Sequence, residues 1–109
     1  MKSNYRYSVL FLFLIITHVG CSVTPKMKQP IWIDVRTEEE YVQGHLANAI
    51  NIPYEEIGAR VSQVTEDKSA DIRVYCRTGR RSGIAKETLE SLGYDHVTNE
   101  GGYQDLISR

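Results

Sequence analysis

The residue types best suited to chemistry in this sequence are gathered in one short segment that begins at Cys76. This segment consists of Cys76, Arg77, Thr78, Gly79, Arg80, Arg81 and Ser82. A thiolate is a nucleophile, and nearby arginines and inward-pointing backbone N–H groups lower the pKa of a thiol below its free value of about 8.5. We therefore expect Cys76 to be largely thiolate at neutral pH, in a loop that binds a small anion through its arginines.

The alternative is an inert buried cysteine beside a solvated basic surface, because free cysteines are commonly buried. Overall charge argues against it: the chain has 13 basic and 14 acidic side chains, yet basic residues concentrate at this thiol. The same slightly acidic balance makes bulk nucleic-acid binding an unlikely role, since that needs a basic surface. Which of the three arginines contact the anion stays open.

The elements on either side of this segment must position the thiol. Asp71 to Tyr75 alternates polar and apolar residues, which predicts a strand that delivers Cys76 at its C-terminal end. Ligand sites of open α/β sheets lie beyond such ends. A helix is expected from Ser82 to the C′ glycine Gly93, and its N-terminus directs partial positive charge at the same point. Its predicted apolar face comprises Ile84, Ala85, Thr88, Leu89 and Leu92.

The preceding segments also read as a strand followed by a helix. Ile31 to Val35 is a short apolar run typical of a buried parallel strand. Thr37 and Glu40 form a capping box, which predicts a short helix over Glu38 to Gln43 that Gly44 ends.

The remaining segments continue this alternation. Ala49 to Ile52 is expected to be extended, because Pro53 follows it. Tyr54 to Val64 predicts a helix whose apolar face is Ile57, Val61 and Val64. Tyr94 to Thr98 predicts a last short strand, and a turn at Gly101-Gly102 leads into a short terminal helix or turn over Tyr103 to Ile107. This order indicates α/β architecture, a central mostly parallel sheet flanked by helices.

Residues 1–20 have the pattern of a signal peptide, with Lys2 and Arg6 before the apolar run Val9 to Thr17. The run is shorter than the roughly 20 apolar residues of a membrane-spanning helix, although a retained N-terminal anchor is the alternative. Residues 21–30, with prolines and lysines, are expected to be a tether, and residues 31–109 one folded domain. We expect an exported protein, periplasmic or lipid-anchored in the cell envelope.

Cys21 stands where a bacterial lipobox has its lipidated cysteine, with Gly20 before it. A lipobox usually has Leu three residues before the cysteine, and this chain has His18 there. Cys21 is therefore either a lipid anchor or an incidental residue. If it is lipidated, Cys76 is the only free thiol of an exported chain, which favours a chemical role over a disulfide.

Taken together, the motifs resemble the rhodanese family, in particular its short single-domain members exported by bacteria. The resemblance spans nearly the whole chain after the signal segment. The stretches that carry it are Trp32-Ile33-Asp34-Val35-Arg36, Glu40-Tyr41-Val42-Gln43-Gly44-His45, Ala49-Ile50-Asn51-Ile52-Pro53, Val74-Tyr75-Cys76, Gly79-Arg80, and Gly93-Tyr94 through Gly101-Gly102. It implies a rhodanese fold over residues 31–109, with an active-site loop from Cys76 to Arg81.

The resemblance also implies an activity, that of a thiosulfate sulfurtransferase. Cys76 would take the outer sulfur of thiosulfate as a persulfide and pass it to a thiophilic acceptor, cyanide or a thiol. Backbone N–H groups of the loop would hold the persulfide, and Arg80 with Arg81 the oxyanion end. The alternative is a persulfide carrier that a partner protein loads and that turns over thiosulfate poorly.

Two other enzyme classes fit the loop less well. Related phosphatases of the dual-specificity type use Cys-x5-Arg, but here Ser82 stands six residues after Cys76. A thiol oxidoreductase would need the second cysteine of a Cys-x-x-Cys pair, which this loop lacks.

Other polar residues are expected to be structural. Asp34 is predicted to accept backbone hydrogen bonds, and Arg36 to pair with a helix carboxylate such as Glu40, because buried charges need partners. His45 has no second histidine or thiol at ligand spacing, so no metal site is expected, and no cofactor.

Overall fold

The computed structural model describes Gly20 and residues 28–109 of the 109-residue chain. The predicted signal peptide apart from Gly20, Cys21 and most of the predicted tether lie outside the described residues. Among the helices in the described part, none combines the length and the apolar character needed to cross a membrane.

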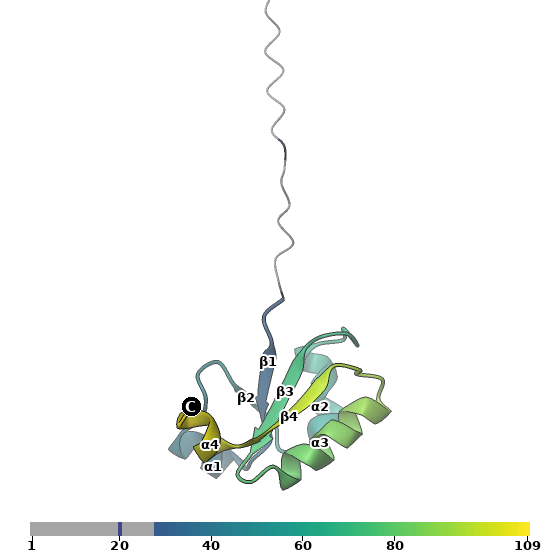
Figure 1. Cartoon of the computed structure of the whole chain (residues 1–109). Helices are drawn as coiled ribbons and strands as arrows, with labels where there is room; N and C mark the ends of the chain where they lie inside the picture. The colour runs from purple at the N-terminus through teal and green to yellow at the C-terminus, as the bar shows by residue number, and fades with distance from the viewer. Residues whose placement is uncertain (1–19, 21–27) are drawn as a thin grey trace, which may run out of the picture.

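Four parallel strands form one sheet in the order β2-β1-β3-β4. The strands are β1 Ile31–Asp34, β2 Ile50–Asn51, β3 Ile72–Cys76 and β4 Val97–Gly102. β3 lies between β1 and β4, so Cys76 ends an interior strand of the sheet (Figure 1). The α/β class predicted from the alternating pattern is therefore confirmed.

Helices flank the sheet on both sides (Figure 1). The helices are α1 Glu38–Gln43, α2 Ile57–Val64, α3 Arg80–Ser91 and α4 Tyr103–Ile107. α2 and α3 pack together against one face of the sheet, and α3 packs on β3 and β4. On the other side, the end of α1 approaches α4: a Cβ built on Gly44 would lie 3.0 Å from the Tyr103 hydroxyl oxygen.

The core lies between the sheet and the helices α2 and α3. Burial of apolar surface in this layer drives the fold. Its fully buried aliphatic side chains are Ile33, Val35, Ile52, Ile57, Ile72, Val74, Ala85 and Leu89. β3 is buried at every residue except the half-buried Arg73, as expected for an interior strand of a parallel sheet.

Both early helix predictions are confirmed, one of them with a shifted start. α1 begins after the Thr37 cap, and Thr37 and Glu40 form the predicted capping box. α2 begins at Ile57 rather than Tyr54, because the chain first turns after Pro53, where the Glu56 N–H donates to the Pro53 carbonyl at 2.9 Å. Its buried face is that of Ile57 and Val61, as predicted.

The predicted face of the helix after Cys76 is partly wrong. Ala85 and Leu89 are buried, but Ile84 and Leu92 are 38% and 42% exposed. Ser82 is buried in their place. Positions 82, 85 and 89 are spaced by three and four residues, so they share the helix side that faces the sheet. The hydroxyl of Ser82 is thereby directed inward, toward the end of β3.

The last strand lies further along the chain than predicted: it was expected over Tyr94 to Thr98, and β4 begins at Val97 and ends at Gly102. β4 runs through Gly101 and Gly102, which were expected to form a turn, and Gly102 pairs with Cys76 after an irregularity in the β3–β4 register. A side chain at Gly102 has no room, since a Cβ there would lie 2.6 Å from the Arg77 carbonyl oxygen. The glycine lets β4 support the cysteine loop at close range.

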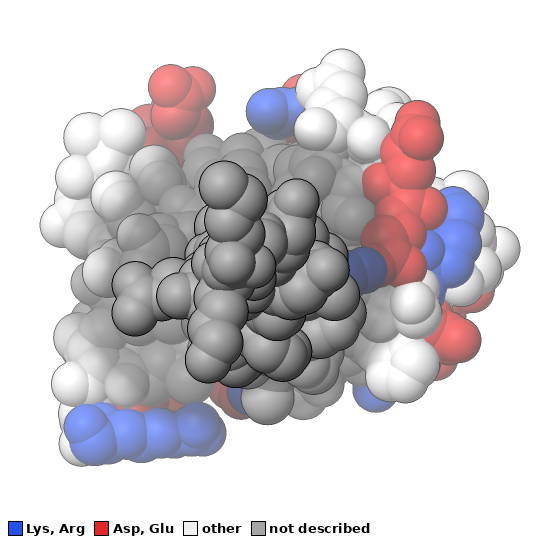
Figure 2. Space-filling model, turned by 90° about the horizontal axis from the view of Figure 1, so that it is seen from above, with Lys and Arg blue, Asp and Glu red and all other residues white. Residues whose placement is uncertain are grey.

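The surface seen along the sheet from the N-terminal side carries charges of both signs. In Figure 2, acidic and basic side chains alternate around the visible rim, with no broad area of a single sign.

Candidate active site

Cys76 and the helix α3 are joined by a very short loop. Cys76 is the last residue of β3, and α3 begins at Arg80, two residues before the predicted start at Ser82. The first turn of α3 is polar, so apolar periodicity could not mark its start. Gly79 caps the helix with a φ of 99°, a left-handed conformation that glycine adopts without strain.

The thiol of Cys76 is buried and surrounded by donors. The residue is 1% exposed. The Gly79 backbone N–H donates to Sγ at 3.0 Å, and the Ser82 hydroxyl lies 3.4 Å from Sγ. Both donors belong to the cap and first turn of α3, whose unpaired N–H groups and dipole favour an anion at this point.

These surroundings shift the pKa of the Cys76 thiol downward. Burial by itself raises that pKa, because it disfavours the charged form. The Ser82 hydroxyl and the backbone N–H groups of Ser82, Thr78 and Gly79 stabilise the thiolate and together outweigh the effect of burial. A nucleophilic sulfur is thus stabilised without a separate general base.

The three arginines of the loop have different environments. Arg77 and Arg80 are exposed, as is Thr78, and neither arginine makes an ion pair or side-chain hydrogen bond with another described residue. Arg81 is half-buried and bound by Glu40. The two exposed guanidinium groups are therefore free to meet an anion, whereas Arg81 already has a carboxylate partner.

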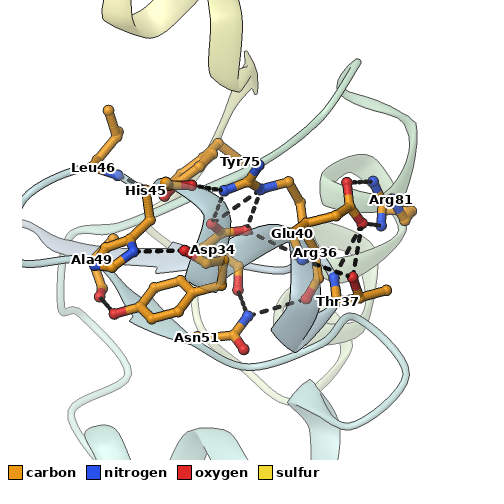
Figure 3. Close-up of polar contacts among 12 residues, drawn as sticks. Asp34, Arg36, Thr37, Glu40, His45, Leu46, Ala49, Asn51, Tyr75 and Arg81 are labelled. Carbon is orange, nitrogen blue, oxygen red and sulfur yellow. Dashed lines mark hydrogen bonds and ion pairs between the residues drawn. The ribbon is translucent and has the colours of Figure 1, made fainter.

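The partner of Arg81 is the helix α1. Its Nη1 and Nη2 donate to Glu40 Oε1 and Oε2 at 2.6 and 3.0 Å (Figure 3). The hydrogen bond from Arg81 is the main reason that the pKa of Glu40 falls to about 2. Glu40 also completes the capping box with Thr37. One carboxylate thus caps α1 and ties it to the first turn of α3.

The prediction that Arg36 pairs with Glu40 is wrong. Arg36 binds Asp34 instead, with Nε and Nη2 donating to its carboxylate, the shortest contact being 2.6 Å (Figure 3). Both side chains are buried, Asp34 lies two residues away at the end of β1, and the Glu40 carboxylate is paired with Arg81. The predicted backbone hydrogen bond to Asp34 is present, from the Arg36 N–H at 3.0 Å.

Arg36 also fixes the neighbouring segments. Its Nη2 donates to the Gly44 carbonyl at 2.7 Å, and its guanidinium lies 4.4 Å from the centre of the Tyr103 ring. The ion pair therefore joins the end of β1 to the end of α1 and to α4. Its role in this structure is to position the rim of the site.

A cleft of about 420 Å³ opens beside the cysteine loop. It is lined by Arg36, Glu40, Gln43, Gly44, Arg77, Tyr103 and Gln104. Within residues 28–109, no three His, Cys, Asp or Glu side chains are grouped as metal ligands. The ring of His45 stacks on Tyr41, and its Nδ1 lies 2.8 Å from the Tyr41 carbonyl oxygen.

Sequence reasoning missed one residue of this site, Asn99 in β4. Its side chain contacts both Gly79 and Ser82, the two residues that approach Sγ. The only local signal was a polar amide in a strand two residues before a pair of glycines, and this signal does not say which loop the amide meets.

Comparison of the sequence with known proteins identifies a family and several relatives. Residues 24–108 match the family model of the rhodanese-like domain. The chain is 49% identical over 75 residues to the thiosulfate sulfurtransferase PspE of Escherichia coli strain K12, a match that covers 69% of this chain and 72% of that protein. It is 37% identical over 70 residues to a sulfurtransferase of Allochromatium vinosum, covering 64% of each.

Solved structures agree with this result. A rhodanese with anions from E. coli superposes with a TM-score of 0.68 at 48% identity, covering 71% of this chain and 91% of that one. The human single-domain sulfurtransferase TSTD1 superposes with a TM-score of 0.65 at 25% identity, covering 73% and 82%.

Proposed function

The chain belongs to the rhodanese-like family and is a sulfurtransferase, and from that premise we propose that it moves the outer sulfur of thiosulfate to a thiophilic acceptor through a persulfide on Cys76. The observation that carries this proposal is the environment of Sγ: a buried sulfur at a strand end, with donors at 3.0 and 3.4 Å and its pKa below the ordinary value.

The reaction takes place in two displacements. In the first, the Cys76 thiolate attacks the outer sulfur of thiosulfate and forms a new S–S bond. The S–S bond within thiosulfate breaks, and its electron pair leaves with sulfite. In the second, cyanide or a thiolate attacks the outer sulfur of the persulfide, and Cys76 leaves as a thiolate. Cyanide becomes thiocyanate, and no net oxidation of the enzyme occurs.

The loop residues serve these steps in different ways. The N–H of Gly79 and the hydroxyl of Ser82 stabilise the sulfur anion at the beginning and end of the cycle. The exposed Arg80 and Arg77 attract thiosulfate and hold its sulfonate oxygens. Arg81 contributes positive charge to the loop while its guanidinium is held by Glu40, so Arg80 rather than Arg81 makes the direct contact with the substrate.

Intact mass spectrometry of the purified full chain, before and after thiosulfate, tests the persulfide. We expect a gain of one sulfur atom that cyanide removes. A Cys76→Ser variant is the control for any sulfur carried elsewhere, including at Cys21. If the wild type gains no sulfur from thiosulfate but is loaded by a partner protein, the chain is a persulfide carrier and the thiosulfate reaction is wrong.

We also propose that the chain is exported and anchored in the cell envelope through a lipidated Cys21. The proposal is supported by Lys2 and Arg6 before an apolar run and by Gly20 before Cys21. Fractionation of cells grown with a labelled fatty acid tests it. We expect label in the membrane fraction that a Cys21→Ser variant loses; a soluble, unlabelled wild-type protein would contradict the anchor.

A further inference from the structure

Asn99 makes three hydrogen bonds around the cysteine loop from a strand on the other side of it. Its Nδ2 donates to the Gly79 carbonyl at 2.9 Å. Its Oδ1 accepts from the Ser82 hydroxyl at 2.7 Å and from the Gly101 N–H at 3.0 Å. The side chain thus holds both residues that donate to the Cys76 sulfur, although it lies 17 and 20 residues further along the chain.

The hydroxyl of Ser82 has one proton and two acceptors in reach. It lies 2.7 Å from Asn99 Oδ1 and 3.4 Å from Cys76 Sγ. A hydroxyl donates only one hydrogen bond at a time, so the proton points either to the amide oxygen or to the sulfur. When the sulfur is a neutral thiol, the Ser82 hydroxyl donates its hydrogen bond to Asn99, the nearer acceptor. When the sulfur is an anion, it is the stronger acceptor and competes for this hydrogen bond.

Turning the Ser82 hydroxyl from Asn99 Oδ1 toward the sulfur costs little free energy, because Asn99 Oδ1 keeps a second hydrogen-bond donor. The Gly101 N–H still donates to that oxygen after Ser82 has turned away. An acceptor left without any partner would carry a desolvation penalty. Because two donors share this amide oxygen, the Ser82 hydroxyl can donate to Asn99 when the sulfur is neutral and to the sulfur when it is an anion.

The other half of the Asn99 amide fixes Gly79. This glycine has a left-handed conformation, and its N–H donates to Sγ at 3.0 Å. Its carbonyl accepts from Asn99 Nδ2 and from the Gly83 N–H. The two bonds restrain a flexible residue in the orientation that aims its N–H at the sulfur.

We propose that Asn99 is a positioning residue for Cys76, which acts by aiming the Gly79 N–H at Sγ and by accepting the Ser82 hydroxyl hydrogen bond until the sulfur becomes charged, when the hydroxyl turns to donate to Sγ. The catalytic consequence rests on the proposed function, in which Cys76 alternates between thiolate and persulfide. The positioning of Gly79 and Ser82 does not rest on the proposed function, since it concerns Cys76 before any sulfur is transferred.

The test is the pH dependence of Cys76 alkylation by iodoacetamide in the full chain, followed by peptide mass spectrometry so that Cys21 does not contribute. In Asn99→Ala, two effects oppose each other: loss of the bond to the Gly79 carbonyl raises the midpoint of the profile, and release of the Ser82 hydroxyl from Oδ1 lowers it. We expect the loss at Gly79, whose N–H is the nearer donor to Sγ, to prevail, with a rise of about one pH unit, which is about tenfold less thiolate at neutral pH. Asn99→Asp is expected to raise it at least as much, because its charge retains the Ser82 proton and it lacks the Nδ2 donor. Arg81, whose charge acts on Cys76, and its partner Glu40 are the same in all variants, as are the other loop arginines Arg77 and Arg80.

A double variant shows whether Asn99 acts through Ser82. Ser82→Ala removes the hydroxyl that Asn99→Ala would otherwise release to the sulfur, so Asn99→Ala is expected to raise the midpoint more in that background than alone. The matched control is Thr98→Ala, an exposed neighbour in β4, with the wild-type midpoint expected. A wild-type midpoint in folded Asn99→Ala, or an equal shift with and without Ser82, would overturn the proposal.

Circular dichroism and urea unfolding separate these results from misfolding. Asn99 is exposed, so its substitution removes no core packing, and a moved alkylation midpoint in a folded variant is not a stability effect. If wild-type Cys76 gains no sulfur from thiosulfate while the Asn99 variants still shift its alkylation, the proposed function fails and the positioning role stands.

Discussion

Arg81 and Glu40 form a two-fold hydrogen-bonded ion pair, Nη1 to Oε1 at 2.6 Å and Nη2 to Oε2 at 3.0 Å. The pair joins α1 to the first turn of α3 and divides the loop arginines by role. Arg81 is part of the connection between helices, whereas Arg77 and Arg80 have no such partner in the described part of the chain.

This division predicts opposite effects for two alanine variants. Arg80→Ala is expected to raise KM for thiosulfate about fivefold to tenfold, because it removes a charged donor for the anion, and to change stability by less than about 0.5 kcal/mol. Arg81→Ala is expected to lower the free energy of unfolding by about 1–2 kcal/mol. Steady-state kinetics and urea unfolding measure both. An Arg81→Ala variant with unchanged stability would contradict the structural role.

The same ion pair predicts a loss of stability in acid. The pKa of Glu40 is about 2 in the folded chain, below its ordinary value of 4.5. A lowered folded-state pKa stabilises the fold above the unfolded pKa, and this contribution is lost as the pH falls from about 4.5 toward 2. Urea unfolding at about pH 5 and about pH 3 should therefore show a smaller loss in Glu40→Gln than in the wild type.

Asp67 also contributes to the loss of stability in acid, and its contribution must be separated from that of Glu40. The pKa of Asp67 is about 2 as well, mainly because of a hydrogen bond from Lys28. An Asp67→Asn variant, which keeps Glu40, provides that comparison. Equal acid losses in wild type and Glu40→Gln would show that Glu40 does not contribute in this range.

Gly102→Ala is expected to damage the loop although it adds only one methyl group. The new Cβ would lie 2.6 Å from the Arg77 carbonyl oxygen, so backbone must move, at a cost of about 1–3 kcal/mol. Because Arg77 follows Cys76 directly, sulfur transfer should fall as well. Gly58→Ala is the control: its Cβ would meet only the Thr88 methyl at 3.2 Å, within a helix that favours alanine. Thermal unfolding and turnover measure both, and a Gly102→Ala enzyme with wild-type turnover would contradict the contact.

Arg36→Ala is expected to be the most destabilising of these substitutions. Asp34 is fully buried, and removal of Arg36 leaves its carboxylate without a cation, which costs about 3–5 kcal/mol. The Gly44 carbonyl loses its donor at the same time. Urea unfolding at neutral pH measures the loss. Arg60→Ala should change stability little, because this arginine is partly exposed and its ion-pair partner among the described residues is the exposed Glu56. A loss below about 1 kcal/mol in Arg36→Ala would show that the buried pair matters less than its geometry indicates.

The sequence alone determined the features that depend on neighbours along the chain. The strand before Cys76, the capping box of Thr37 and Glu40 and the apolar face of α2 are local patterns, and the structure confirms them. The spacing of the cysteine loop and the motifs around it were also enough to indicate the family.

Only the tertiary structure decided which side chains meet. Arg36 pairs with Asp34, and Glu40 pairs with Arg81 instead. Asn99, in β4, hydrogen-bonds Gly79 and Ser82 beside the cysteine. Such pairings depend on how β1, β3, β4 and the helices pack, and several carboxylates and amides were equally available in the sequence. The start of α3 at Arg80 was hidden for a related reason: its first turn contacts the sulfur and α1 rather than the core, so it carries no apolar pattern.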